Sequence, residues 1–537
     1  MSKKNERNGL INVLEVFPRT ASMLNDIVNE EIINKFGIDL ERFPDEVENI
    51  KESYSLKDYI GDVARIEYAR FKAKNTEESI EEPENRTVNP SFQLLQVSWQ
   101  NLISIFNGDD KGKGNGNDII SGDQLIMVWK DKDEDEVRME YASSDDLLAL
   151  KIVVEGIGPE DLVSDTDLTI GKIDNVIRSS IEKGILIAPP SSLVRDPDIF
   201  KEIKDTGEEF LVADTFTLQW HITQSCDLHC KHCYDRSDRT NTDLADAIRI
   251  LDDMRSFCLE RNVKGHISFS GGNPLMHPDF LDIYNAASDR GFSLAILGNV
   301  ASRKQLKDII AIQMPGFYQV SLEGLEGHND SIRGEGYFRR VMDFLTVLKE
   351  LGIYSMVMLT LTNENIDQVI PLAELLKGKV DSFTFNRLSL VGEGASLKMA
   401  DNEKFRKFLE DYIELAGKNK HVRLKDNFIN IIRREKGQNP FGGCAGYGCS
   451  AAFNFITVLP DGEVHACRKF PSKIGRIMDV SLSELYDSEM AKKYRSGPEE
   501  CRGCDIRAVC GGCMAVAYGC GKDVFKEKDP FCFMRLV

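Results

Sequence analysis

The sequence of 537 residues contains no run of about 18 apolar residues, so it has no segment that could cross a membrane as a helix. Its first residues, MSKKNERNGLINV, are basic but lead into neither a long apolar core nor a small-residue cleavage site, which argues against a signal peptide. Basic residues are in deficit, because 67 Lys and Arg against 87 Asp and Glu give a formal net charge of -20. Such a charge repels a phosphate backbone. We therefore expect a cytoplasmic protein that binds neither membranes nor nucleic acid.

Cysteine is too scarce for a disulfide scaffold, with 13 residues in 537. A chain of this length also buries enough apolar surface to fold without disulfides. The cysteines gather in one short cluster, residues 226–233, and in a second cluster after residue 444. This distribution is typical of metal ligands in a reducing compartment.

The first 200 residues predict two modules. Residues 1–123 are expected to be mainly helical, and the apolar stripe from Leu95 to Phe106 predicts a buried helix at i, i+4, i+7 spacing. Residues 124–200 combine β-like runs and helix-like segments and close on GILIAPP, which suggests a winged-helix-like module. Its β-like runs are Leu125–Trp129 and Val137–Tyr141, and its helices are Asp145–Glu155 and Ile170–Lys183. The acidic net charge favours a peptide over DNA as its partner.

Strand-like and helix-like segments alternate after a connector of residues 190–212. The expected strands are Thr215–Thr223, Gly265–Phe269, Phe292–Leu297, Tyr318–Leu322, Ile353–Leu361 and Val380–Asn386. Six β/α units in a row predict an α/β domain over residues 213–400, with a parallel sheet that is open or curled into a partial (β/α)6 TIM-like barrel. Catalytic groups on such folds lie at the carboxyl ends of the strands.

Two motifs follow the first two predicted strands. Cys226, Cys230 and Cys233 form a C-x3-C-x2-C pattern, and three thiolates leave one iron of a four-iron cluster open for a ligand that is not protein. A zinc loop and three buried cysteines are the alternatives, since C-x2-C is shared with zinc sites. The second strand ends in SGGNP, residues 270–274, whose glycines expose backbone to a ligand.

These motifs together resemble the radical S-adenosylmethionine (SAM) superfamily over residues 216–388. The resemblance implies a [4Fe-4S] cluster on Cys226, Cys230 and Cys233 that binds SAM and cleaves it to a 5′-deoxyadenosyl radical, which abstracts a hydrogen atom from the substrate. It implies that SAM is contacted by His232, Gly271, Gly272, Asn273, Ser321, Arg333 and Leu388. Arg333 would pair with the SAM carboxylate. Asn273 stands where the family has Glu, and its amide can still accept a hydrogen bond.

The C-terminal cysteines resemble the SPASM extension, an iron–sulfur domain, which we place at residues 440–537. A C-x12-G-x4-C spacing runs from Cys449 to Cys467 and a C-x2-C-x5-C spacing from Cys501 to Cys510. The resemblance implies two auxiliary [4Fe-4S] clusters, one on Cys444, Cys449, Cys467 and Cys513 and the other on Cys501, Cys504, Cys510 and Cys532. The family has three residues before the next cysteine where this chain has two, so Cys520 stays an alternative ligand. Zinc is the alternative metal here.

Residues 58–70 and 88–106 resemble accessory proteins of enzymes that make oxazolone or thiooxazole rings from peptide cysteines. The whole arrangement resembles the thio(seleno)oxazole-modification, or selenobiotic, peptide maturases. This implies an enzyme that binds the leader of a ribosomally made precursor peptide, attacks one of its residues, for example a Cys, and takes electrons from a donor such as flavodoxin or ferredoxin. A sulfatase-maturating enzyme that forms formylglycine is one alternative. It would have an acidic base after the auxiliary-cluster cysteine, whereas Arg468 follows Cys467 here. A non-catalytic iron–sulfur electron carrier is the other.

Overall fold

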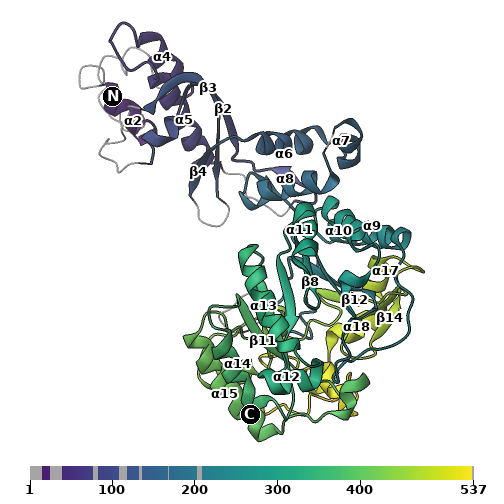
Figure 1. Cartoon of the computed structure of the whole chain (residues 1–537). Coiled ribbons are helices and arrows are strands. Elements are labelled where there is room, and N and C mark those ends of the chain that lie inside the picture. The colour runs from purple at the N-terminus through teal and green to yellow at the C-terminus, as the bar shows by residue number, and fades with distance from the viewer. Residues whose placement is uncertain are drawn as a thin grey trace. The chain divides into compact units, whose positions relative to one another are not determined.

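The computed structural model describes residues 15–24, 39–76, 83–107, 118–131, 136–166, 168–201, 203 and 208–534. The chain forms two compact units, residues 1–190 and 191–537 (Figure 1). Each unit has its own buried apolar clusters. Among the described residues, no helix combines the length and the apolar character that crossing a membrane requires.

The first part of unit 1 is a three-stranded antiparallel sheet in the order β2-β3-β4, packed against helix α5. Val63, Ile66 and Ala69 of α5 share a buried cluster with Val97 of β2 and Ile126 of β3. The strands are β2 (Gln93–Gln100), β3 (Ile120–Lys130) and β4 (Val137–Tyr141), and the helices are α2 (Pro18–Leu24), α4 (Phe43–Ile50) and α5 (Ile60–Lys74). This part of the chain is therefore mixed rather than mainly helical.

The predicted buried helix from Leu95 to Phe106 is wrong. Its first half belongs to strand β2, and a short 3-10 helix, η1 (Leu102–Ile105), follows Asn101. Leu95, Val97 and Trp99 all face the same apolar cluster, as alternate residues of a strand do. The spacing of four residues from Leu95 to Trp99 fits one face of a strand as well as one face of a helix, and pairing with the distant β3 decides between them.

The second part of unit 1 contains the two helices that the sequence predicts, with one further helix between them. Helix α6 begins with a capping box in which the Ser143 hydroxyl and the Asp146 carboxylate each bond to the other's backbone N–H. Two short strands pair antiparallel, one before and one after residue 123. These elements are β1 (Thr87–Val88), β5 (Leu186–Ile187), α6 (Ser144–Glu155), α7 (Pro159–Asp165) and α8 (Ile170–Glu182). The pairing of β1 with β5, and the position of β3, mean that both sheets of unit 1 cross the boundary we expected at residue 123.

Unit 2 contains the predicted six parallel strands, which lie side by side in chain order. Each begins and ends within two residues of its prediction: β6 (Thr215–Thr223), β7 (Lys264–Gly271), β8 (Ser293–Leu297), β9 (Phe317–Ser321), β10 (Ser355–Leu361) and β11 (Ser382–Arg387). Between them lie α9 (Leu244–Glu260), α10 (Phe280–Asp289), α11 (Arg303–Ile312), α12 (Glu326–Arg333), α13 (Tyr337–Glu350) and α14 (Val369–Leu376). Crossovers of one hand between strands in chain order place all these helices on one face of the sheet.

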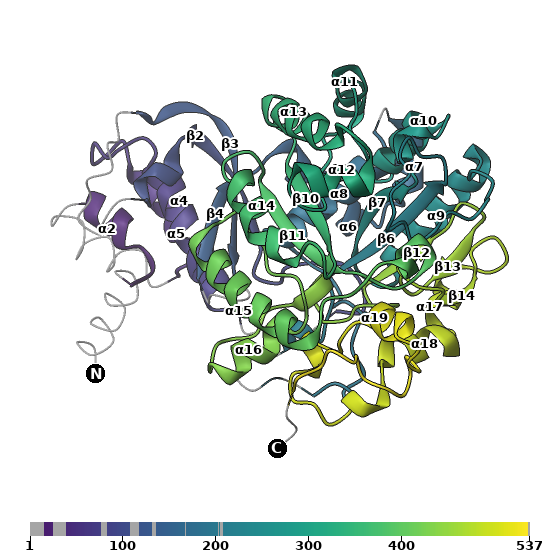
Figure 2. The same ribbon diagram turned by 60° about the horizontal axis from the view of Figure 1, so that its bottom comes forward.

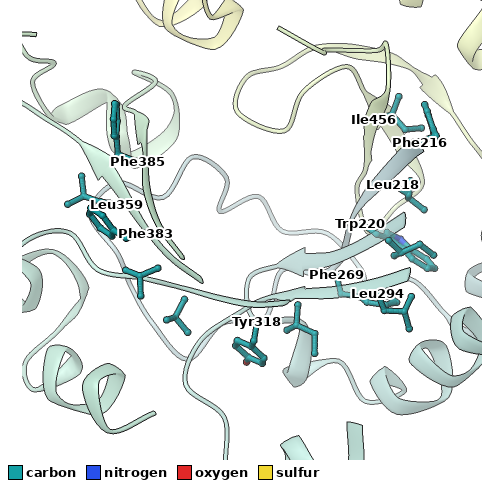
Figure 3. Close-up of a cluster of buried hydrophobic side chains, with 14 of the residues drawn as sticks. Phe216, Leu218, Trp220, Phe269, Leu294, Tyr318, Leu359, Phe383, Phe385 and Ile456 are labelled. Atoms are coloured by element: carbon teal, nitrogen blue, oxygen red, sulfur yellow. The ribbon is translucent and has the colours of Figure 1, made fainter. Parts of the chain in front are cut away.

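The two faces of this curved sheet differ in polarity. Phe216, Leu218 and Trp220 alternate along β6, are fully buried and lie on the outer side toward the helices, as do Phe269 of β7 and Phe385 of β11 (Figure 3). The residues between them point to the inner side. On that side several strands carry polar residues: His221, Ser270, Gln319, Ser321 and Thr360. The sheet thus has an apolar outer core and a polar interior.

The cysteine-rich segment continues the same sheet. Strand β12 (Phe455–Val458) pairs parallel with β6, and β13 (Glu463–His465) and β14 (Lys473–Arg476) follow as antiparallel strands (Figure 2). The remaining helices are α15 (Asn402–Lys418), α16 (Ile429–Glu435), α17 (Leu482–Asp487), α18 (Glu489–Ser496) and α19 (Met514–Gly519), and the short 3-10 helices are η3 (Glu208–Phe210), η4 (Pro274–Met276), η5 (Ile366–Gln368), η6 (Gly392–Ser396), η7 (Gly443–Ala445), η8 (Glu499–Cys501) and η9 (Arg507–Val509). The mixed α/β class that the sequence predicts is confirmed, and the two predicted C-terminal domains share one sheet.

Candidate active site

A cavity of about 510 Å³ lies where the carboxyl ends of the parallel strands meet. Residues at or after the carboxyl ends of β6, β7, β9 and β11 all contribute to its wall. Its lining includes Cys226, Cys230, His232, Cys233, Gly271, Gly272, Ser321, Arg333 and Leu388. Asn273 is the one predicted SAM contact that does not line it.

Gly271 and Gly272 allow the end of β7 to pass directly against the start of the cysteine loop. Gly271 has a φ of 127°, and a Cβ there would lie 2.1 Å from the backbone oxygen of Thr223. A Cβ on Gly272 would lie 2.3 Å from the backbone oxygen of Ser225. Since real Cβ atoms do not approach an oxygen so closely, any side chain at either position would push the two segments apart.

Two other segments, at the end of α12 and after β11, also bond to the cysteine loop. The Lys231 N–H donates to the Ile332 carbonyl at the end of α12, at 3.1 Å. The Glu393 N–H donates to the Cys233 carbonyl at 2.8 Å, next to Gly392, where a Cβ would lie 2.5 Å from the Tyr234 oxygen. The loop is therefore fixed by the segments that follow β7, β9 and β11.

A buried ion pair joins two of the predicted site residues through Glu323, which the sequence does not single out. Glu323 Oε1 accepts hydrogen bonds from Arg333 Nε at 2.9 Å and Nη2 at 2.6 Å, and lies 3.2 Å from His232 Nε2. Its Oε2 accepts from the Thr360 N–H at 2.8 Å. Burial raises the pKa of Glu323, but the charges of His232 and Arg333 outweigh it and lower the pKa to about 2. The carboxylate thus stays ionised and orients both side chains.

Asn273 has a different surrounding from the one we expected. Its Oδ1 accepts from the Leu275 N–H, and its amide donates to Asp227 Oδ1 at 3.0 Å. Asn299, after β8, donates to the same carboxylate oxygen at 2.6 Å and lies 3.5 Å from the Cys226 sulfur. Both amides therefore brace Asp227, the neighbour of Cys226. Asn299 could have been found as a polar residue near the end of a predicted strand.

The structure brings C-terminal cysteines together in two places. Burial raises the pKa of Cys449 to about 12, with further contributions from Cys513, Cys467 and Cys444 nearby. Burial likewise raises the pKa of Cys501 to about 11, and Cys504 and Cys532 add to it. One cavity is lined by all four thiols of this second group, Cys501, Cys504, Cys510 and Cys532. Cys520 is exposed and lies 3.8 Å from the sulfur of Met399.

The donor set of each group suits an iron–sulfur cluster. In the described residues no three His, Cys, Asp or Glu side chains are arranged to hold a single metal ion. The four thiolates of a cubane each bind a different iron, so they need not converge on one point. The Nδ1 atom of His232 is buried without a hydrogen-bond partner beside the three-cysteine loop. An unpartnered buried nitrogen at this place also suits a bound ligand.

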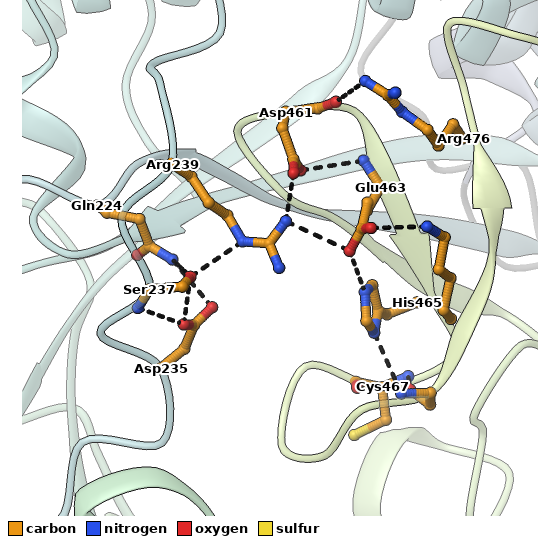
Figure 4. Close-up of polar contacts among 11 residues, drawn as sticks. Gln224, Asp235, Ser237, Arg239, Asp461, Glu463, His465, Cys467 and Arg476 are labelled. Carbon is orange, nitrogen blue, oxygen red and sulfur yellow. Dashed lines mark hydrogen bonds and ion pairs between the residues drawn. The ribbon is translucent and has the colours of Figure 1, made fainter.

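A polar network connects the end of the cysteine loop with Cys467 (Figure 4). Arg239 forms ion pairs with Asp461 and Glu463 on the β12–β13 hairpin and bonds to Ser237 after the loop. Glu463 lies 3.3 Å from His465, whose Nδ1 accepts from the Ser472 N–H. The Ser472 hydroxyl then bonds to the backbone of Cys467. This network fixes the position of the three-cysteine loop relative to Cys467.

Three polar side chains meet inside the barrel below the cysteine loop. Tyr234 Oη lies 3.1 Å from His221 Nε2, and the guanidinium of Arg468 lies 5.4 Å from the centre of the Tyr234 ring. Arg468 also donates to the hydroxyl of Ser270 at 3.2 Å. Burial lowers the pKa of His221 to about 3, and the charge of Arg468 acts in the same direction, so the imidazole is neutral at physiological pH.

Comparison with known families agrees with this geometry. Residues 220–376 match the family model of the radical SAM superfamily, and residues 449–505 match the SPASM model, described as an iron-sulfur cluster-binding domain. The chain therefore contains a radical SAM domain and is an enzyme. The SPASM match agrees with the spacing of the C-terminal cysteines.

Curated relatives cover about three fifths of the chain. An AdoMet-dependent heme synthase from Methanosarcina barkeri is 26% identical over 347 residues, which span 59% of this chain and 96% of the relative. The mycofactocin maturase MftC of Mycolicibacterium smegmatis is 26% identical over 335 residues, spanning 59% of this chain and 82% of the relative. Among solved structures, Streptococcus suis SuiB bound to the precursor peptide SuiA matches with a TM-score of 0.50 and 15% identity, covering 76% of this chain and 96% of SuiB. This last likeness shows a shared fold.

Proposed function

We propose that this enzyme modifies a ribosomally made precursor peptide by abstracting a hydrogen atom from one of its residues, with a cysteine as the expected target. The cavity that joins the three-cysteine loop, the two glycines and Arg333 at one rim carries the proposal. When bound there, the [4Fe-4S] cluster and SAM would supply an electron and a 5′-deoxyadenosyl radical. The chain itself would bind and orient the cofactor and the peptide and would exclude water from the cavity.

Each predicted SAM contact has a role in this proposal that its surroundings support. Cys226, Cys230 and Cys233 would hold the cluster, and the unpartnered Nδ1 of His232 is available to a ligand in the cavity. Glu323 takes two nitrogens of Arg333, so a SAM carboxylate would bind the third, Nη1, which lies 3.5 Å from the Cys230 sulfur. Ser321 and Leu388 line the same cavity and would contact the nucleoside.

A peptide substrate is supported by what this chain has beyond its relatives. The heme synthase is matched over 96% of its own length, yet 41% of this chain lies outside that match. MftC is named a maturase, and SuiB is described as bound to a precursor peptide. We infer that unit 1 holds the leader of the precursor, which raises the effective concentration of the core segment at the cavity.

The eight C-terminal thiols would hold two auxiliary [4Fe-4S] clusters, which gives three clusters in total. Closed coordination by four cysteines leaves no iron open for SAM. We therefore assign these clusters to electron transfer, with flavodoxin or ferredoxin as the external donor. The selenobiotic maturases remain the branch that the N-terminal segments 58–70 and 88–106 resemble most.

The two alternatives make different demands on the site. Formylglycine formation would require an acidic base after Cys467, and the Arg468 found there lies inside the barrel beside Ser270. An electron carrier would need no cavity beside an open three-cysteine loop. Neither alternative uses the additional unit 1.

Co-expression tests the proposal. Short cysteine-containing reading frames that neighbour the gene would be expressed with the enzyme under anaerobic conditions, and the peptides examined by mass spectrometry. We expect one of them to show a mass change together with 5′-deoxyadenosine, and Cys226→Ala to abolish both. A mass change that persists with Cys226→Ala would contradict the proposed chemistry, and 5′-deoxyadenosine without any peptide change would contradict the substrate class.

A further inference from the structure

The charged side chains that line the central cavity are mostly cations, although the chain has a net charge of -20. Three of these cations have carboxylate partners outside the lining. Arg333 pairs with Glu323, Arg387 pairs with Asp426 and Asp529, and Arg236 lies 4.0 Å from Glu393. These pairs account for the structural role of each arginine.

Arg468 and Lys469 differ, because neither forms an ion pair with a carboxylate among the residues that the structure describes. Burial raises the pKa of Cys467 to about 11 and also raises that of Cys513, and the charge of Lys469 opposes both shifts, so this lysine lies by the thiols of the first auxiliary group. Lys425, a third cation nearby, has Cys444 and Cys467 among its charged neighbours. An anionic cluster on those thiolates would balance both lysines.

Arg468 forms no ion pair among the described residues, and Asp235, the carboxylate in the cavity lining, is instead bonded to Gln224 and Ser237. Its contacts are the Ser270 hydroxyl at 3.2 Å and the face of the Tyr234 ring at 5.4 Å, and both are neutral groups inside the barrel. A guanidinium has five N–H donors, and the hydrogen bond to Ser270 uses one of them. A half-buried cation without a partner is electrostatically unfavourable, and a carboxylate that accepted two parallel N–H bonds would relieve this.

We propose that Arg468 forms a carboxylate-binding subsite for the substrate, so that the peptide presents an acidic side chain or its C-terminal carboxylate next to the residue that is modified. This inference rests on the proposed function and adds the chemical class of the recognised group. Ser270 and Tyr234 hold the guanidinium over the barrel interior, and Lys469 adds positive potential on the same wall of the cavity. Arg468 is thus a specificity-determining residue that selects peptides with a negative charge next to the modified residue.

A defined peptide library tests the subsite without knowledge of the natural precursor. The reconstituted full-length enzyme with SAM would be equilibrated with synthetic octapeptides, acetylated and amidated at their ends, whose central residue is Glu, Gln or Lys between randomised flanks. Retained peptides would be separated by gel filtration and quantified by mass spectrometry. We expect Glu over Gln by about tenfold, as one charge-assisted bidentate pair allows. A parallel set with free C-termini separates side-chain from C-terminal recognition.

The variants make the result specific to Arg468. Arg468→Lys should keep a preference for Glu, Arg468→Gln should lose it, and Arg468→Glu should turn it toward Lys. Arg249→Gln, at a 64% exposed arginine on α9, is the matched control and should behave as wild type. Iron content and circular dichroism verify that each variant is folded and loaded.

Two outcomes separate this inference from the proposed function. If wild-type enzyme forms 5′-deoxyadenosine from SAM but selects peptides without regard to charge, or if Arg468→Glu selects the same peptides as wild type, the subsite is refuted alone. If wild-type enzyme forms no 5′-deoxyadenosine, the proposed function fails, whatever the peptide preference. Selection of Glu by wild type and of Lys by Arg468→Glu supports the subsite.

Discussion

Replacing Glu323 with Gln tests whether one buried carboxylate organises the cavity. Glu323 is 2% exposed and is bound by Arg333, His232 and the Thr360 N–H. Glutamine has nearly the same shape but no charge, so it leaves the Arg333 guanidinium buried without a counter-charge. Removing one partner of a buried ion pair costs about 3–5 kcal/mol.

The pKa of the carboxyl gives an independent magnitude. Its ordinary value of 4.5 falls to about 2 in the folded protein, which corresponds to about 3 kcal/mol of stabilisation at about 1.4 kcal/mol per pKa unit. Because the folded pKa is the lower one, this stabilisation is complete above the unfolded value of 4.5 and is lost as the pH falls through about 2. The difference in stability between wild type and Glu323→Gln should therefore be constant from about pH 8 to 5 and shrink below 4.5.

Hydrogen–deuterium exchange of strand β10 measures this effect where it arises, since the Thr360 N–H donates to Glu323. A loss of about 3 kcal/mol in the opening free energy corresponds to exchange about a hundredfold faster. Glu326→Gln is the matched control, because Glu326 on the neighbouring α12 forms an exposed ion pair with Arg339 worth about 0–1 kcal/mol. Equal exchange rates for the two variants, or a difference that grows as the pH falls, would refute the reasoning.

Three further predictions concern other parts of the chain. Cys510→Ala should reduce the iron content after anaerobic reconstitution from about twelve to about eight atoms per chain, and four irons with zinc in wild type would contradict the auxiliary clusters. Removing residues 1–190, whose described apolar clusters are separate from those of unit 2, should abolish modification of the precursor while 5′-deoxyadenosine still forms. Unchanged peptide turnover would exclude leader binding by unit 1. Arg195→Met leaves three backbone carbonyls without donors, at about 1–3 kcal/mol each, so it should lower the urea midpoint and the iron content. Arg502→Met, at the exposed end of η8, should change neither.

The parts of the fold that the sequence predicts well are those with strong local patterns. Strand β6 has the predicted bounds because Phe216, Leu218 and Trp220 alternate with polar residues over nine positions. Strand β12 was not predicted, since its four residues carry little periodicity and its partner β6 lies more than 230 residues earlier. Strand β2 was assigned to a helix because its apolar spacing fits both structures. Long-range pairing, which no local window contains, decides the cases of β12 and β2.

The candidate site also contains residues that the sequence predicts and residues that only the structure reveals. The ligand-like residues have a fixed spacing within one loop, so Cys226, Cys230 and Cys233 are visible in the sequence. Glu323 and Asn299 have no such spacing, and they become recognisable when the sheet places them against His232 and Cys226. Their role is to orient residues from other strands, and such a role exists only in three dimensions.

The connector between the two units is the part whose role changes most between sequence and structure. Its composition suggests a loop, yet Leu193 and Phe200 are buried in the core of unit 2, and Val194 forms a bridge with Val212. Arg195 is stacked between the rings of Phe200 and Phe453 and donates to the carbonyls of Tyr447, Cys449 and Arg495.

These bonds make the connector part of the wall behind Cys449, which we propose as an auxiliary-cluster ligand. The guanidinium of Arg195 has no carboxylate partner among its described contacts, and burial lowers its pKa to about 10. A cluster held by Cys449 would be the nearest anion, so iron loading and the folding of the connector should stabilise one another. Arg195→Met tests this coupling directly: the urea midpoint of the iron-loaded protein should fall more than that of the iron-free protein, and equal decreases would show that Arg195 only fills space.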